Sequence, residues 1–197
     1  MLFVVRHGRA DFPMPGAWVG RLDPPLSEEG AGELEALLPF IRTLEAEKVY
    51  TSPLRRAGES ARILADGLGL PLEKADGLLE MDLGVFSGHT PEEIATLHPE
   101  AWDAYLHDTV GTAPPGGEAF ADMAERVIAF GMAVESEGTA LLVTHTGPLL
   151  ALACHAMGLP FATRVRLHPA TASVTKLALT SRRLFFFGHT PALRDPS

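Results

Sequence analysis

The sequence predicts an α/β sandwich with a mainly parallel sheet. Short apolar runs rich in β-branched residues alternate with longer segments whose apolar residues recur with a helical period. Two of these short runs end directly at a histidine, His7 and His145. Because ligands of such sheets bind beyond the carboxyl ends of the strands, we expect the two histidines at one binding edge.

The first third of the chain contains two expected strands and a helix. Residues 2–6 are continuously apolar up to the last position, which predicts a buried parallel strand. Ser27 is a candidate N-cap for a helix with apolar residues at helical spacing up to Ile41, where Pro39 predicts a kink or a stop. Residues 48–51 predict the next strand.

A second helix is expected directly after that strand. Ser52 followed by Pro53 predicts an N-cap and a first helical residue, and the helix should continue to about residue 68. Arg55 and Arg56 then lie in its first turns, close to the carboxyl end of the preceding strand.

Capping signals define the helices of the middle region. Thr90, Pro91 and Glu93 predict a capping box at the start of a short helix, and the cluster 114–117 of Pro and Gly separates it from a longer one. The buried stripe of that longer helix is expected to consist of Phe120, Met123, Val127, Phe130 and Val134.

The last third predicts a strand, a helix and a hairpin. Residues 139–144 form an apolar strand with His145 at its carboxyl end, and Gly147-Pro148 opens a helix to Met157. Two β-rich runs close the chain as a hairpin, residues 172–179 and 184–187.

Length and composition favour one domain with a substantial core. The chain has 197 residues, of which 46% are hydrophobic, so we expect a single domain over residues 1–197. No repeat or linker divides it. Residues 81–125 are predicted to be a cap inserted within this domain.

Charge and hydropathy limit the partners. A net charge of −9 would repel a polyanion, so nucleic acid is not an expected partner. No apolar run approaches the ~18 residues of a membrane span, and no secretory leader opens the chain. We therefore expect a cytoplasmic protein, with the one cysteine, Cys154, as a buried apolar residue. The oligomeric state is left open.

Five residues offer the groups that phosphoryl transfer needs. That reaction requires an in-line nucleophile, cations for the phosphate oxygens and an acid for the leaving oxygen. A neutral imidazole at His7 can be the nucleophile. Arg6 and Arg56 have planar forks that match phosphate oxygens, and His145 adds a donor. Glu80 is the candidate acid, because cap residues that keep it dry would raise its pKa.

Further groups can contact the phosphate or the rest of the substrate. Thr146 and the residue after it can donate backbone N–H groups at a helix N-terminus. Arg9, Gly20 and Arg21 lie in the loop after His7 and are candidate substrate-binding residues.

Six ordered sequence blocks resemble the histidine phosphatase superfamily, the phosphoglycerate mutase-like clan. The blocks are Arg6-His7-Gly8, residues 23–30, residues 51–57, residues 79–84 with Gly88, residues 114–118 and Val143-Thr144-His145. The resemblance implies a three-layer α/β/α sandwich with a small helical cap. It also implies a nucleophile at His7, a phosphate clamp of Arg6, Arg56 and His145, and a proton donor at Glu80, with no metal or other cofactor.

The charge of the predicted cap bears on the substrate. Residues 81–125 contain nine acidic residues and no Lys or Arg, which disfavours a substrate with a second strong anion near the cap. The hypothesis is therefore a phosphomonoesterase for a small phosphorylated metabolite with a neutral leaving group. Trp18, Phe86, Trp102 and Phe120 are candidates for an apolar leaving-group site, although packing in the core competes with that role.

Two other functions stay open at this point. A cofactor-dependent phosphoglycerate mutase needs cations for a substrate carboxylate, and Arg9 and Arg21 would have to supply them. A non-catalytic phospho-ligand binding protein on the same fold is the alternative from another class.

Overall fold

The computed structural model describes residues 1–190 and confirms the α/β sandwich. The last seven residues of the predicted domain 1–197 lie outside the described residues. One six-stranded sheet has the order β3-β2-β4-β1-β5-β6. Its strands are β1 (Leu2–Arg6), β2 (Lys48–Thr51), β3 (Leu72–Lys74), β4 (Ala140–Thr144), β5 (Val174–Ala178) and β6 (Arg183–His189).

The four strands from β1 to β4 run parallel, whereas β5 is antiparallel to β1 and β6 is antiparallel to β5. The predicted, mainly parallel sheet and the closing hairpin are thus confirmed. β3 was not predicted. It is an edge strand of three exposed residues and has no apolar alternation to reveal it.

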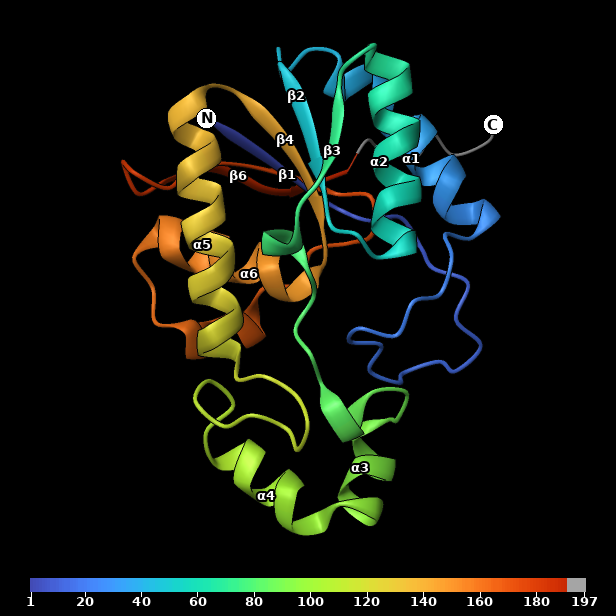
Figure 1. Cartoon of the computed structure of the whole chain (residues 1–197), viewed down its shortest axis with the longest axis vertical. Helices are drawn as coiled ribbons and strands as arrows, with labels where there is room; N and C mark the ends of the chain where they lie inside the picture. The colour runs from blue at the N-terminus through green and yellow to red at the C-terminus, as the bar shows by residue number, and fades with distance from the viewer. Residues whose placement is uncertain (191–197) are drawn as a thin grey trace.

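Four helices cover the two faces of the sheet (Figure 1). α1 (Glu28–Ile41) and α2 (Arg55–Leu68) lie on one face, and α5 (Phe120–Glu137) and α6 (Thr146–Met157) lie on the other. Successive residues of β1 point to opposite faces, so Phe3 and Val5 join the core under α1 and α2 while Leu2 and Val4 join the core under α5 and α6. Both faces are buried, which explains why this strand is apolar throughout.

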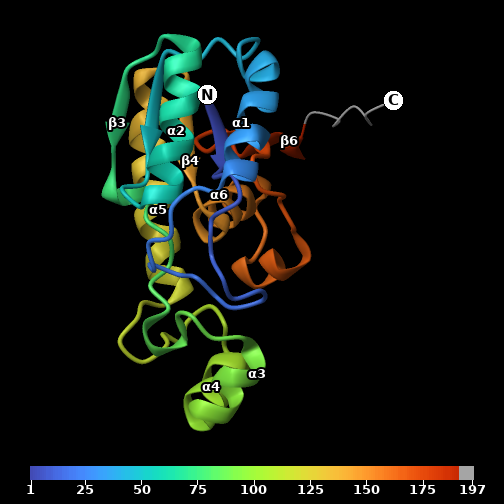
Figure 2. The same cartoon turned by 90° about the vertical axis from the view of Figure 1, so that its right-hand side faces the viewer.

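Two short helices, α3 (Pro91–Leu97) and α4 (Pro99–His107), lie beyond the carboxyl ends of the parallel strands (Figures 1 and 2). The predicted capping box is confirmed: the Thr90 hydroxyl accepts the Glu93 N–H at 3.3 Å, and the Glu93 carboxylate accepts the Thr90 N–H at 2.9 Å. α4 was not predicted, because Tyr105 is its only buried residue and gives no helical stripe. Residues 120–125, which the predicted cap included, form the first turns of α5.

Three short 3₁₀ helices connect these elements: η1 (Asp76–Leu78), η2 (Gly84–Phe86) and η3 (Phe161–Arg166). η2 places Phe86, which is fully buried, at the centre of an aromatic cluster with Trp18, Trp102 and Tyr105. The ring centroids of Phe86 and Tyr105 are 5.7 Å apart. Trp18 belongs to the loop after β1, so this cluster ties that loop to α4.

Two predicted helix starts differ from the structure. α2 begins at Arg55 with Leu54 as its N-cap, so the predicted cap at Ser52 and first helical residue at Pro53 are wrong. The Ser52 side chain is fully buried and contacts the ring of His145 instead, at 2.8 Å. α6 begins one residue earlier than predicted, at Thr146. Pro39 lies inside the last turn of α1, which ends two residues later.

α6 lies between the sheet, α5 and η3, and most of its side chains are buried. Cys154 is among them, as predicted, with no exposed surface. Across residues 1–190, no helix has both the length and the apolar character required for crossing a bilayer.

The aromatic cluster predicts a stability effect. Phe86→Ala should lower the free energy of unfolding by about 3–5 kcal/mol, because it removes a fully buried ring and leaves a cavity. The matched control is Val85→Ala in the same 3₁₀ helix. Val85 is 38% exposed, so the loss should be about 0.5 kcal/mol or less. Urea denaturation measures both, and similar small losses for the two variants would contradict the prediction.

Candidate active site

The two histidines meet at the carboxyl edge of the sheet, as the sequence predicted. β1 and β4 are adjacent and parallel, with Arg6 opposite Thr144. Each strand ends at these residues and is followed by a histidine, so the two histidines are neighbours. The His7 N–H donates to the Thr144 carbonyl at 2.9 Å. The ring centroids of His7 and His145 are 5.1 Å apart, edge to face. The two imidazoles therefore pack against each other at this edge of the sheet.

The partners of the His7 ring define its tautomer. Nδ1 lies 2.7 Å from the Gly8 carbonyl, which can only accept a hydrogen bond. Nε2 lies 3.2 Å from Nε of Arg56, which can only donate. The proton of a neutral ring is therefore on Nδ1, and the lone pair of Nε2 faces the guanidinium group.

The surroundings of His7 keep this ring neutral. Burial is the largest cause, and the charge of Arg56 is the next; together they lower the pKa of His7 from 6.5 to about 3. The Gly8 carbonyl acts in the opposite direction, and Arg6 adds to the lowering. A ring with this pKa has a free electron pair throughout the neutral pH range.

Arg56 connects the nucleophile candidate to the loop after β1. It lies in the first turn of α2, and only 2% of its surface is exposed. One terminal nitrogen donates to the Leu22 carbonyl at 2.7 Å and the other to the Gly20 carbonyl at 2.8 Å. Gly20 has a positive φ of 52°, a conformation that favours glycine. Its predicted contact with substrate remains a prediction, but its carbonyl orients Arg56.

Two buried polar atoms have no partner among the described residues: Nε of Arg6 and Nδ1 of His145. Arg6 uses one terminal nitrogen to bind the Pro169 carbonyl at 2.7 Å. Nε2 of His145 lies 2.8 Å from the Ser52 hydroxyl, and when that hydroxyl donates, Nδ1 carries the proton. The site then presents two unused N–H donors, which is what an anion pocket requires.

Glu80 is held beside the histidines by two backbone N–H groups. Its carboxylate accepts from Met81 at 2.9 Å and from Gly147, in the first turn of α6, at 3.3 Å. Burial raises the pKa of Glu80, although these two bonds and the charges of Arg56 and Arg6 oppose the rise. Gly147 was expected to offer its N–H to an anion, but here it donates to Glu80. A Cβ at Gly147 would overlap this carboxylate.

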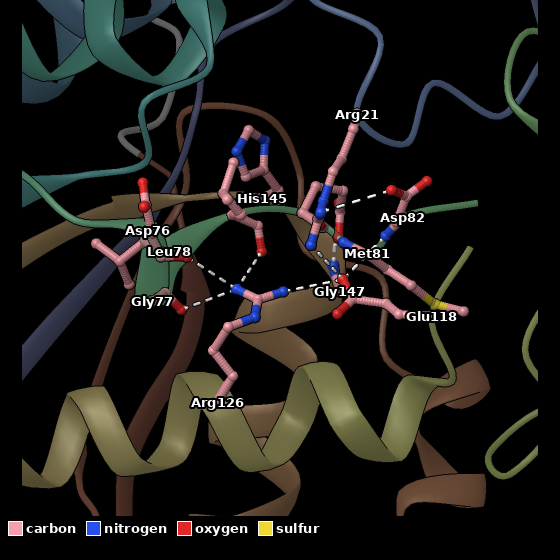
Figure 3. Close-up of polar contacts among 12 residues, drawn as sticks. Arg21, Asp76, Gly77, Leu78, Met81, Asp82, Glu118, Arg126, His145 and Gly147 are labelled. Atoms are coloured by element: carbon pink, nitrogen blue, oxygen red, sulfur yellow. Dashed lines mark hydrogen bonds and ion pairs between the residues drawn. The ribbon is translucent and has the colours of Figure 1, made fainter. Parts of the chain in front are cut away.

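An ion-pair network holds the backbone on either side of Glu80 (Figure 3). The Glu118 carboxylate pairs with Arg21 at 2.7 Å and with Arg126 of α5 at 2.9 Å, and it accepts the Asp82 N–H at 3.0 Å. Arg21 also donates to the Glu80 carbonyl at 3.1 Å. Arg126 donates to three carbonyls of the segment before Glu80, those of residues 76, 77 and 79.

A cavity of about 370 Å³ opens above these groups and is lined by four of the five predicted residues, Arg6, His7, Arg56 and Glu80, together with Gly20, Thr146 and Gly147. His145 is fully buried and is not part of this wall. Trp18 and Phe120 also line it, whereas Phe86 and Trp102 pack behind them. The structure does not bring the other two substrate-binding candidates into the cavity. Arg9 is exposed and pairs with Glu29 at 3.2 Å, and Arg21 is engaged in the network around Glu118. Within residues 1–190, His, Cys, Asp and Glu form no cluster suited to a metal ion.

Among the polar side chains of the cavity wall, the sequence interpretation missed Tyr105 of α4 and Arg164 of η3. Arg164 lies outside residues 81–125, so the cap lacks cations but the cavity does not. The argument for a neutral leaving group therefore loses its premise. Nothing in the local sequence of η3 could have revealed this, because only the fold places η3 against the cap, where Arg164 donates to the Thr109 carbonyl.

Comparison with known proteins agrees with this geometry. The sequence model of the histidine phosphatase superfamily (branch 1) matches residues 2–187. Phosphoserine phosphatase 1 of Hydrogenobacter thermophilus is 31% identical over 160 residues, which are 80% of this chain and 76% of that protein. A structure of mycobacterial glucosyl-3-phosphoglycerate phosphatase Rv2419c with VO3 aligns with a TM-score of 0.83 at 30% identity, over 96% of this chain and 98% of that chain.

Some relatives are longer. Bifunctional protein Rv2228c of Mycobacterium tuberculosis is 34% identical over 178 residues, which are 88% of this chain but 49% of that protein. This chain thus spans about half the length of that relative, and the similarity concerns the part that has the present fold.

The tautomer and charge of His7 are directly measurable. Because its pKa is lowered to about 3, the ring should stay neutral from pH 8 down to about pH 4.5, with the proton on Nδ1. Long-range ¹H–¹⁵N NMR of protein labelled at histidine should show Nε2 unprotonated over this range, and His7→Ala assigns the signals. Protonation of the ring with a midpoint near 6.5 would contradict the prediction.

Proposed function

The chain belongs to the histidine phosphatase superfamily, and we propose that it hydrolyses the phosphomonoesters of small metabolites through a covalent phosphohistidine at His7, without a metal ion. One observation carries the proposal. The unprotonated Nε2 of a neutral His7 adjoins a cavity whose wall contains Arg6 and Arg56, and the buried ring of His145 packs edge to face against the His7 ring. The names of the relatives, which act on phosphoserine and glucosyl-3-phosphoglycerate, support a small phosphorylated substrate.

In the first step Nε2 of His7 attacks phosphorus, and the bond between phosphorus and the ester oxygen breaks. The Arg56 N–H that holds this lone pair moves to a phosphate oxygen as the substrate enters. Arg6, through its unused Nε–H, and His145, through Nδ1–H, bind the remaining oxygens. These donors stabilise the negative charge that the oxygens share in the transition state.

Glu80 acts as the general acid in the first step and as the general base in the second. Since burial raises its pKa, it can carry a proton at neutral pH and give it to the leaving oxygen. In the second step the Glu80 carboxylate takes a proton from water, the water oxygen attacks phosphorus, and the bond from phosphorus to His7 breaks. Inorganic phosphate leaves, and His7 and Glu80 return to their starting forms.

The nucleophile is tested by turnover and by trapping. The purified chain should release phosphate from p-nitrophenyl phosphate in the presence of EDTA, and rapid alkaline quenching of the reaction with a radiolabelled phosphomonoester should trap labelled phosphate on His7. His7→Ala should lower kcat by about 10³-fold or more, because no other group can form the covalent intermediate. Gly32→Ala is the control, since a Cβ at that exposed α1 position meets nothing within 4 Å.

Other outcomes would identify other functions. Efficient interconversion of 3- and 2-phosphoglycerate with a bisphosphoglycerate requirement would show a mutase. Tight phosphate binding by both the natural chain and His7→Ala, with no turnover by either, would show a binding protein. Both results contradict the proposed function.

The proton donor is tested by the leaving group. Glu80→Gln should lower kcat for glycerol 3-phosphate by about 10²–10³-fold, because an alkoxide leaves poorly without a proton. The loss for p-nitrophenyl phosphate should be at least tenfold smaller, about 10-fold or less, because the nitrophenolate leaves readily without one. Equal losses for the two esters would contradict a role as proton donor.

A further inference from the structure

Arg164 is a buried cation without a carboxylate partner. Its residue is 7% exposed, and none of the ion pairs formed within residues 1–190 includes it. Arg21 and Arg126, by contrast, share Glu118. Buried charges in proteins are normally paired, because their removal from water is costly. Arg164 therefore lines the cavity without a direct ion pair, although its charge contributes at longer range to the lowered pKa of Asp108.

Neutral groups hold this guanidinium in a fixed position. Its two terminal nitrogens donate to the carbonyls of Phe161, at 3.2 Å, and Thr109, at 2.6 Å. Its Cζ lies 4.1 Å from the centre of the Phe120 ring, so the ring covers one face of the group. Two of the five N–H groups are used in this way. The contacts orient the guanidinium without neutralising it.

The three arginines of the cavity wall lie near different groups: two are beside His7, and the third is beside Tyr105. Arg6 and Arg56 adjoin His7 and help to lower its pKa. Arg164 lies beside Tyr105, where burial raises the pKa of the phenol and the charge of Arg164 opposes that rise. A phosphoryl group bound between Arg6, Arg56 and His145 therefore leaves Arg164 to face the rest of the substrate.

Building on the proposed phosphatase function, we infer that Arg164 forms a second anion site, which binds a carboxylate on the leaving group. The substrates are then phosphomonoesters of small hydroxy acids. A carboxylate suits a planar guanidinium because two parallel hydrogen bonds can form. Charge also favours it: Arg6 and Arg56 balance a phosphate dianion, and the single charge of Arg164 balances one carboxylate.

A pair of matched esters isolates the carboxylate. 3-Phosphoglycerate and glycerol 3-phosphate both carry the phosphate on a primary carbon, but the first has a carboxylate where the second has a hydroxymethyl group. The natural chain should prefer 3-phosphoglycerate in kcat/KM by about 10- to 100-fold, as expected for hydrogen bonds between charged groups. O-Phosphoserine and O-phosphoethanolamine form a second pair, in which a hydrogen takes the place of the carboxylate.

Variants then assign the preference to Arg164. In Arg164→Met the ratio of the two kcat/KM values should fall to about 1, mainly through a higher KM for the acid. Arg164→Lys keeps the charge but loses the fork, so its ratio should lie between the two. Arg166→Gln is the matched control, because Arg166 belongs to the same 3₁₀ helix and is exposed. Its ratio should equal that of the natural chain.

Affinity provides a readout that does not need turnover. In His7→Ala, calorimetry should give a Kd for 3-phosphoglycerate about 10-fold or more below that for glycerol 3-phosphate. The difference should disappear in His7→Ala/Arg164→Met. Equal affinities for the two esters in His7→Ala would overturn the inference whether or not the chain is an enzyme.

The outcomes separate the inference from the proposed function. Hydrolysis of p-nitrophenyl phosphate by a chain that shows no preference for the acid would overturn the inference and leave the phosphatase intact. A preference that survives unchanged in Arg164→Met and Arg164→Lys, with equal losses for both esters, would overturn it too and make Arg164 structural. Absence of all hydrolysis, together with a preserved difference in affinity, would overturn only the proposed function.

Discussion

The contact between Arg56 and His7 is the constraint on which the rest of the site depends. It places a buried guanidinium against an imidazole, and within residues 1–190 that guanidinium forms no direct ion pair. Burial and this proximity together keep the imidazole neutral, and the lone pair of its Nε2 faces the guanidinium in the cavity wall. The same guanidinium donates hydrogen bonds to the carbonyls of Gly20 and Leu22. The side chain of Arg56 therefore also fixes the backbone of the loop after β1. The position of Arg56 therefore determines the orientation of the nucleophile, part of the phosphate clamp and the shape of the cavity wall.

The sequence revealed the parts of the site that lie at the ends of regular elements. His7 and His145 follow apolar strands, and the pairing of parallel neighbours then brings them together. Glu80 follows no such element; it was chosen because residues of the predicted cap could keep it dry, and the resemblance of the sequence blocks to a known family supported that choice. Ser52 was misassigned because serine before proline is a frequent helix cap, and a sequence pattern does not show that a buried histidine competes for the same hydroxyl.

Residues missed by the sequence interpretation share a physical cause. β3 and α4 bury too little apolar surface to show a periodicity. Arg164 reaches the cavity only because η3 lies against α5 and the loop that contains Thr109. The charge of residues 81–125 was misleading for a related reason: Glu118 counts as a cap acid in the sequence, but in the fold it balances Arg21 and Arg126. The charge that a substrate meets depends on which ionic groups are already paired.

The missing side chain at Gly147 limits how such a site can change. The carboxylate of Glu80 occupies the space where any larger residue would place its first carbon. The start of α6 and the carboxyl group that it supports are consequently linked sterically, and neither can be altered alone. Variation that adapts the pocket to new molecules is thus directed to the opposite wall, where η3 and α4 contribute side chains that can be exchanged without disturbing proton transfer.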